Sequence, residues 1–142
     1  MDYEAASINS SETELYRIFE NTKTIAIIGC SPKEEKDSNR VARYLQNAGF
    51  RIVPVYPKED QILGEDVYRS LADIPFKVDM VDVFRKSKEI DAIVDMAIKR
   101  GDIDCLWTQL GLVNNEACQR AHDASIKIVQ DKCTKIEHAK IV

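Results

Sequence analysis

Five short runs of β-branched and other apolar residues recur along the chain, and this recurrence limits the possible folds more than any other feature. Each run is nearly continuous, as is typical of strands buried on both faces of a sheet. The runs are Thr24–Gly29, Arg51–Tyr56, Asp79–Phe84, Ile103–Thr108 and Lys127–Gln130.

Helical patterns separate these runs. The first spans 41–48, with apolar residues at i, i+3, i+4 and i+7. A second spans 90–98 and is closed by Gly101, and a shorter one spans 117–121. Alternating strands and helices form parallel sheets with right-handed crossovers and helices on both faces. The sequence therefore predicts an α/β fold with a doubly wound, five-stranded parallel sheet in the order 3-2-1-4-5.

The segment before the first run predicts an extra helix. Leu15, Ile18 and Phe19 lie at helical spacing within Ser11–Asn21, so this helix should pack on the sheet. Residues 1–10 are expected to fray, and 65–71 to form a short helical turn. A length of 142 residues fits a single domain over 1–142.

Charge and composition exclude several classes of partner. Twenty basic and 24 acidic residues give a net charge of −4, which argues against nucleic acid. No apolar run nears the roughly 18 residues of a membrane span, and the start lacks a secretory pattern, so we expect a cytoplasmic protein without a membrane partner. The four cysteines form no C-x-x-C pair, so neither a zinc site nor a disulfide framework is expected.

Ligands of doubly wound sheets bind outside the carboxyl ends of the strands, where the strand order reverses. In the predicted order this point lies between the first and fourth runs. Gly29, Cys30 and Ser31 should then face 108–111 across one crevice. A lone glycine after a strand is weak evidence, since it also fits a simple tight turn.

The helix after this turn offers an anion site. Ser38 or Asn39 is a suitable N-cap, and the backbone N–H groups of Asn39, Arg40 and Val41 would point toward a bound anion. Arg40 adds a positive charge in the first turn, where it opposes the helix dipole, so a local anion would explain it.

The ends of the next two runs narrow the choice of nucleotide. NAD-binding folds place an acidic residue after the second strand, whereas this chain has Tyr56 and then Lys58. A lysine there suits a phosphate on the adenosine ribose, as in NADP or coenzyme A. After the third run, Phe84 could offer an apolar surface to a base, and Arg85 a positive charge.

Several stretches together resemble a known family. The sequence resembles the small stand-alone CoA-binding proteins of bacteria and archaea, whose Rossmann-like domain also begins the succinyl-CoA synthetase alpha chain. The matching stretches follow one another in order and cover most of the chain from about residue 20. They are 27–31, 38–45, 52–58, 63–65, 70–75, 81–85, 107–111 and 131–138.

The resemblance implies coenzyme A as the ligand. It suggests that the turn after the first strand and the following helix hold the pyrophosphate, that Lys58 lies near the 3′-phosphate, and that 83–85 lie beside the adenosine. Tyr56 departs from the asparagine common in the family. The expected cofactor-binding residues are Gly29, Cys30, Ser31, Ser38, Asn39, Arg40, Val41, Tyr56, Lys58, Val83, Phe84, Arg85 and Gln109.

The expected function is binding of coenzyme A or acyl-CoA without catalysis, with a protein partner or a homodimer as a further possibility. Nothing upstream supplies a nucleophile that His138 could serve. The alternatives are an NADP-type enzyme or redox sensor, and a subunit of an acyl-CoA ligase or transferase. Among the cysteines, Cys30 is predicted to react first, because basic residues lie near it in the sequence.

Overall fold

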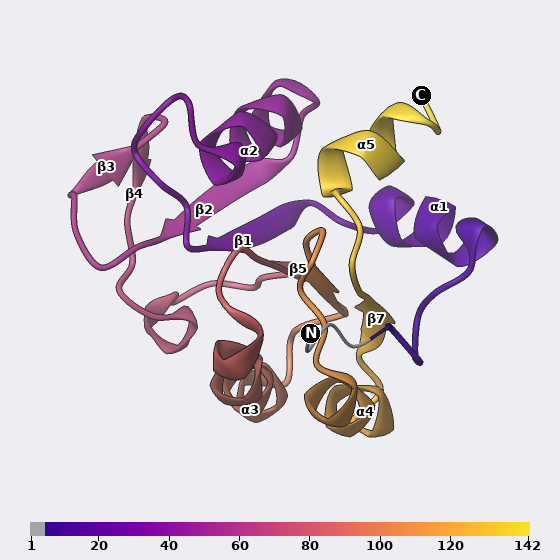
Figure 1. Ribbon diagram of the computed structural model, residues 1–142. Coiled ribbons are helices and arrows are strands. Elements are labelled where there is room, and N and C mark those ends of the chain that lie inside the picture. Colours follow the sequence, from indigo (N-terminus) through magenta and orange to yellow (C-terminus); the bar gives the residue numbers. More distant parts are fainter. Residues whose placement is uncertain (1–4) are drawn as a thin grey trace.

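The centre of the molecule is a five-stranded parallel sheet (Figure 1), and the computed structural model describes residues 5–142. The strands coincide with the five apolar runs, each slightly shorter than its run, which confirms the predicted parallel α/β fold. They are β1 (Thr24–Ile28), β2 (Arg51–Val55), β5 (Met80–Val83), β6 (Cys105–Thr108) and β7 (Lys127–Val129).

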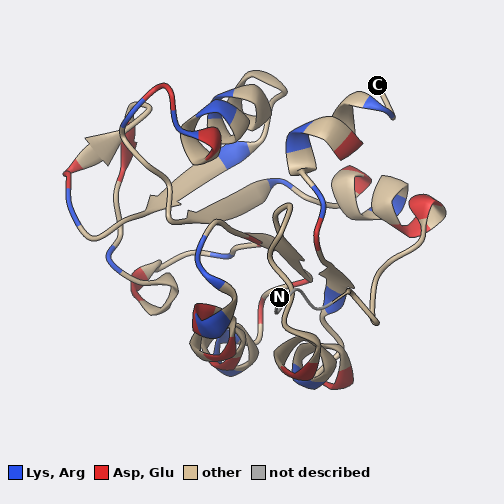
Figure 2. Cartoon of the chain, viewed as in Figure 1, with Lys and Arg blue, Asp and Glu red and all other residues tan. Residues whose placement is uncertain are grey.

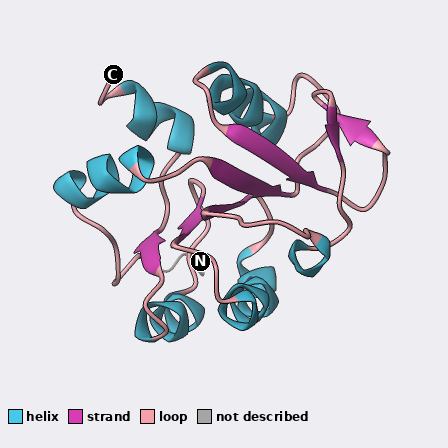
Figure 3. Ribbon diagram, turned by 180° about the vertical axis from the view of Figure 1, so that it is seen from behind, coloured by secondary structure: helices cyan, strands magenta, loops and turns pink. Residues whose placement is uncertain are grey.

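Helices cover both faces of this sheet (Figure 3). One face carries α1 (Glu12–Glu20), α2 (Asp37–Asn47) and α5 (Thr134–Ala139). The other carries α3 (Ile90–Arg100) and α4 (Asn115–Asp123), with the short 3-10 helices η1 (Leu71–Asp73) and η2 (Ser87–Glu89) leading toward them. None of the helices in 5–142 is long and apolar enough to cross a membrane.

The predicted N-terminal helix is confirmed as α1. Ser11 and Glu14 close its first turn by a reciprocal capping box, which satisfies backbone donors that would otherwise lack partners. Leu15, Ile18 and Phe19 are buried against the sheet, as their spacing predicted. Helix α5 was not predicted from the sequence.

The predicted strand order is wrong. The observed order is β2-β1-β5-β6-β7, so the runs lie 2-1-3-4-5 rather than 3-2-1-4-5. The direction of a right-handed crossover depends on the face that carries its connection. The connection from β2 to β5 carries η1, which packs with α3 on the face opposite α2. Strand β5 therefore pairs with β1 on the side opposite β2. The predicted order would have required this connection on the face of α2.

The outer edge of β2 is covered by the segment that follows it. Strands β3 (Gln61–Ile62) and β4 (Glu65–Asp66) form a hairpin. Strand β4 lies within 65–71, where a helical turn had been predicted, and the helical turn observed, η1, begins only at Leu71. The two loop residues of the hairpin have φ values of 55° and 77°, which a two-residue hairpin turn requires. Tyr68 then forms a bridge with Val55.

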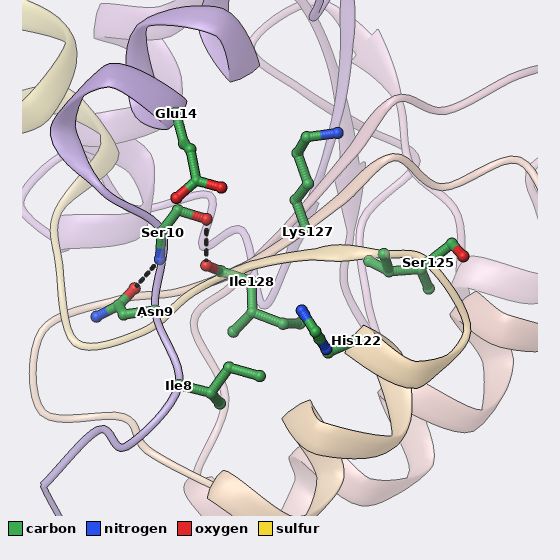
Figure 4. A pocket seen from close by; sticks show the side chains of 9 residues that line it. Ile8, Asn9, Ser10, Glu14, His122, Ser125, Lys127 and Ile128 are labelled. Carbon is green, nitrogen blue, oxygen red and sulfur yellow. Dashed lines mark hydrogen bonds between the residues drawn. The ribbon is translucent and has the colours of Figure 1, made fainter.

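The outer edge of β7 is covered by residues 5–10, which we had expected to fray. The Asn9 side chain donates to the Gln130 carbonyl (3.0 Å) and accepts from its N–H (2.9 Å). Ser10 Oγ donates to the Ile128 carbonyl at 2.7 Å (Figure 4). We call residues 5–10 the N-terminal arm. Part of this arm lines a cavity of about 220 Å³ together with Glu14, β7 and neighbouring residues. Residues 1–4 lie outside the described residues.

Candidate functional site

The strand order reverses between β1 and β5, so the ends of these strands form the centre of the carboxyl edge. Gly29 has a φ of +91°, and a Cβ there would lie 2.9 Å from Phe84 O and 2.8 Å from Arg85 Cδ. Only glycine fits this close approach. The expectation that Gly29 faces 108–111 across one crevice is wrong, because the end of β5 lies between them.

The turn after β1 is held in shape by three buried polar residues. Ser38 Oγ accepts from the Ser31 N–H at 2.9 Å, and Asn39 Nδ2 donates to the Ser31 carbonyl at 2.8 Å. Ser31 Oγ in turn accepts from the Lys33 N–H at 3.1 Å. These side chains therefore fix the backbone of the turn.

Helix α2 begins earlier than predicted, and no side chain caps it. Its N-cap is Lys36, which supplies no capping bond. Ser38 and Asn39 were the expected caps, but Ser38 Oγ and Asn39 Nδ2 are engaged with the preceding turn, and Asn39 Oδ1 is buried without a partner among residues 5–142. Within residues 5–142, no acceptor pairs with the backbone N–H groups of Asp37, Ser38 and Asn39. Free N–H groups and the helix dipole make this end a suitable place for an anion.

The negatively charged partner of Arg40 is a carboxylate of the protein itself. Its guanidinium pairs with the Asp37 carboxylate and donates to the Glu35 carbonyl at 2.6 Å. The loop before α2 thus carries charges of both signs (Figure 2). The positive charge that had suggested a bound anion is explained by Asp37.

A cavity of about 460 Å³ lies on the α3 side of the carboxyl edge, and we call it the arginine cavity. Its basic residues are Arg69, Arg85 and Lys88, and its further walls include Gly29, Tyr56, Ile93 and Met96. Arg85 also pairs with Glu89 at 3.1 Å. Its volume is in the range of small-molecule sites, and its charge suits an anionic group.

Arg69 also shapes the loop after β2. Its Nη1 donates to the carbonyl oxygens of Tyr56 (3.1 Å), Lys58 (2.9 Å) and Glu59 (2.9 Å). The Lys58 side chain is exposed. It lines neither the arginine cavity nor the second cavity of the carboxyl edge, which is described next. Arg69 thus determines where the backbone beneath Lys58 lies.

A second cavity, of about 430 Å³, lies on the α2 and α5 side, and we call it the glutamine cavity. Four predicted site residues line it, from three different elements or their ends: Arg40, Val41, Phe84 and Gln109. Apolar residues dominate the remaining wall, which includes Leu110, Leu112, Cys133 and Ile136. Phe84 and Arg85 are consecutive, so the end of β5 separates the two cavities.

A buried carboxyl group lies behind Gln109. Asp82 is fully buried on β5 and accepts hydrogen bonds from Gln109 Nε2 and from Thr134 Oγ1, the latter at 2.8 Å. Burial raises the pKa of Asp82 to about 7, although both hydrogen bonds act in the opposite direction. The carboxyl group therefore changes its ionisation near neutral pH.

Two predicted site residues direct their side chains into the core. Val83 is fully buried in β5, and so is the Cys30 thiol. Burial and the nearby Asp82 raise the pKa of Cys30 to about 12. The prediction that this thiol reacts first assumed that basic neighbours favour its thiolate, and that assumption is wrong. The more accessible thiol is Cys133, half-buried in the glutamine cavity.

Sequence reasoning missed Arg69, Lys88 and Asp82. Arg69 lies within 65–71, which was predicted as a helical turn, so its position at the carboxyl edge had no visible pattern. Asp82 did leave a signal, because an acidic residue interrupts the third apolar run. Such a residue needs hydrogen-bond donors when it is buried.

Comparison with known proteins independently supports the fold described above. Protein YneT of Bacillus subtilis is 34% identical over 131 residues, which are 92% of this chain and 96% of YneT. The solved structure of a hypothetical protein from Pyrococcus horikoshii OT3 matches with a TM-score of 0.89 at 36% identity, covering 99% of this chain and 98% of that one. The Rossmann-like fold is thus confirmed.

A third likeness is to part of a larger enzyme. The ADP-forming acetate–CoA ligase I of Archaeoglobus fulgidus is 34% identical over 73 residues, which are 51% of this chain but 11% of the ligase. The sequence family described as the CoA binding domain matches residues 23–139. The chain therefore belongs to the CoA-binding domain family.

Proposed function

We propose that this protein binds coenzyme A or acyl-CoA at the carboxyl edge of its sheet and has no catalytic activity of its own. The observation that carries the proposal is the uncapped start of α2 beside the braced turn after β1, in a chain that matches the CoA binding domain. Family membership favours coenzyme A over the alternative of NADP.

The residues of the edge fit the ligand. The N–H groups of 37–39 would hold the pyrophosphate, with Ser31, Ser38 and Asn39 keeping the turn in shape. The N–H groups of Gly29 and Cys30 donate to the Val55 carbonyl, so these two residues would shape the turn as well. Lys58 would lie near the 3′-phosphate, and Val83, Phe84 and Arg85 beside the adenosine. Arg85 lines the arginine cavity, whose positive charges suit the strongly anionic nucleotide end of coenzyme A, whereas Phe84 lines the glutamine cavity.

The surroundings of His138 support the absence of catalysis. Its ring packs edge-on against Phe19, Tyr44 and Phe50, and its Nδ1 lies 2.9 Å from the Tyr44 hydroxyl. Burial lowers the pKa of His138. An imidazole in this position joins α1, α2 and α5, so we assign it a structural role.

A second candidate function is that of a subunit that presents acyl-CoA to a partner chain carrying the nucleophile. Exposed apolar residues favour it: Leu110 is 61% exposed and Ile136 is 49% exposed, both at the glutamine cavity. We also place the protein in the cytoplasm, whose reducing conditions suit four unpaired thiols.

Isothermal titration calorimetry with coenzyme A, 3′,5′-ADP and NADP tests the proposal. Coenzyme A should bind, and NADP should bind at least roughly tenfold more weakly. Lys88→Glu in the arginine cavity should weaken coenzyme A, whereas Lys99→Glu, which changes the same charge at the far end of α3, should not. No binding of coenzyme A, or equal binding of NADP, would overturn the proposal.

A further inference from the structure

We infer that the N-terminal arm is a regulatory strap, whose docking on β7 is coupled to ligand binding in the arginine cavity. A ligand in the cavity should hold the arm in place, and a docked arm should tighten binding by the same factor, because coupling between two equilibria is reciprocal. The inference rests on the proposed function, which supplies the ligand. The connection runs from the arm through Gln130 and Asn114 to η2.

The arm is held on β7 mainly by polar side chains. The Asn9 carboxamide exchanges two hydrogen bonds with the backbone of Gln130, and Ser10 Oγ donates to the Ile128 carbonyl (Figure 4). Exposed and partly buried residues alternate along the arm, and none of them is fully buried. A segment that buries so little apolar surface opens at a much lower cost than the whole domain. The arm can therefore undock while the rest of the protein stays folded.

Gln130 joins the arm to the start of α4. Its side chain is 0% exposed, and its Nε2 donates to the Ile8 carbonyl and to Asn115 Oδ1, both at 3.0 Å. Its Oε1 accepts from the Asn114 N–H at 2.9 Å. When the arm undocks, this buried amide loses the Ile8 carbonyl, and a buried donor without a partner is costly. The docked arm thus determines where Gln130 and the start of α4 lie.

Asn115, the first residue of α4, makes a second link to the arm. Its Oδ1 accepts from the Ser7 N–H, and its Nδ2 donates to the Ala5 carbonyl, both at 2.9 Å. The arm and the start of α4 are therefore joined through side chains at several points, although more than 100 residues separate them in the sequence.

The start of α4 in turn holds η2. The Asn114 Nδ2 donates to the Ser87 carbonyl, and the Val113 N–H donates to Ser87 Oγ, both at 3.3 Å. Ser87 is the first residue of η2, and the other two, Lys88 and Glu89, line the arginine cavity. An anion that binds Lys88 fixes η2, and η2 then favours the arrangement of 113–115 in which the arm is docked.

The arm itself lies away from the ligand. It contributes no residue to the lining of the arginine cavity, and it precedes residues 23–139, which match the CoA binding domain. An effect of the arm on affinity must therefore pass through the residues between them. These are positioning residues for η2.

Hydrogen exchange of the arm measures the coupling. The Ser7 N–H donates to Asn115 across the contact between the arm and α4, so its exchange with solvent reports undocking. Saturating coenzyme A should slow the exchange of 5–10 in the wild-type protein by about fivefold. If coenzyme A binds and this exchange does not change, the inference is overturned while the proposed function stands. If coenzyme A does not bind at all, both have failed.

Calorimetry measures the same coupling from the other side. The double variant Asn9→Ala/Ser10→Ala loosens the arm and should weaken coenzyme A by up to the same fivefold. Gln119→Ala, which removes an exposed bond within α4, is the control and should bind as the wild type does. Unchanged affinity of the double variant, with its arm shown by exchange to be undocked, would contradict the coupling.

A decoupled variant tests the path. Asn114→Asp together with Ser87→Ala removes both bonds between the start of α4 and η2, but keeps the side-chain oxygen at 114 that caps α4 by accepting from the Ala117 N–H. Coenzyme A should still bind this variant, but it should no longer slow the exchange of 5–10. Slowing equal to that in the wild type would rule out this path. If the variant does not fold, exchange in the wild type still decides whether the coupling exists.

Discussion

Asp82 shows how one buried residue can set the pH dependence of a small domain. Its pKa is raised from 3.8 to about 7 by burial, so the fold favours its neutral form. The stability that this residue contributes is therefore fully present below about pH 4 and is lost as the pH rises through about 7.

Asp82→Asn should remove this dependence, because asparagine is neutral at every pH. Between about pH 4 and pH 7, the free energy of unfolding of the wild type should fall relative to the variant by at most about 1.4 kcal/mol per pH unit. Denaturant unfolding of both proteins over this range measures the difference. Parallel pH profiles would show that Asp82 is ionised throughout.

Lys58→Glu should weaken coenzyme A roughly 10- to 100-fold. Dephospho-coenzyme A, which lacks the 3′-phosphate, should lose much less affinity. The change replaces attraction of a phosphate by repulsion, on a loop whose backbone Arg69 holds in place. Calorimetry with both ligands provides the measurement. Equal losses would place Lys58 away from the 3′-phosphate.

Individual site residues could be predicted where a local rule governs them. Gly29 follows a strand, and Phe84 and Arg85 end one, so their presence at the carboxyl edge of the sheet follows from the fold class. The hydrogen-bond partners of site residues could not be predicted in this way. Contacts such as those of Arg69 with 56–59 or of Gln109 with Asp82 join segments that are distant in sequence. Burial of Cys30 likewise depends on which helix covers the turn.

Among the glycines, Gly29 at the junction of β1 and β5 has the least space around it. Gly29→Ala should destabilise the protein by roughly 2–4 kcal/mol, because the new Cβ meets the backbone oxygen of Phe84 in addition to the cost of a positive φ. Gly49→Ala is the matched control: its φ is +103°, but nothing lies within 4 Å of its Cβ. It should cost only about 1 kcal/mol. Thermal and denaturant unfolding compare the two, and equal losses would contradict a steric contact.

The type and approximate position of the main strands and of α1 to α4 could be predicted, because apolar spacing is local; the start of α2 could not, since no side chain caps it. The strand order could not. It depends on which face receives the connection between β2 and β5, and 56–79 contains only η1 and a short hairpin, neither of which has a strong apolar period. The resulting error moved the expected crevice from the β1–β5 junction to a pair of strands that are not neighbours.

At the scale of the whole molecule, both edges of the sheet are covered. Asn9→Ala removes two hydrogen bonds to the backbone of Gln130 and uncovers the edge of β7. It should lower the free energy of unfolding by about 1–3 kcal/mol and increase self-association, since free strand edges pair readily. Gln119→Ala, which removes an exposed bond within α4, is the control. Denaturant unfolding measures the loss of stability, and sedimentation measures the self-association. Identical behaviour of the two variants would contradict a role for residues 5–10 in covering the edge of β7.

The separation of the two cavities by Phe84 and Arg85 has a consequence for kinetics. A ligand that reaches around the end of β5 into both cavities behaves as a bivalent one, because each half holds the other at a high effective concentration. Either half alone should then bind far more weakly than the intact molecule. Dissociation of such a ligand would proceed in two steps, so one end could leave its cavity and return many times while the other stays anchored. For coenzyme A bound as proposed, each excursion would present the thiol or thioester outward on a tether.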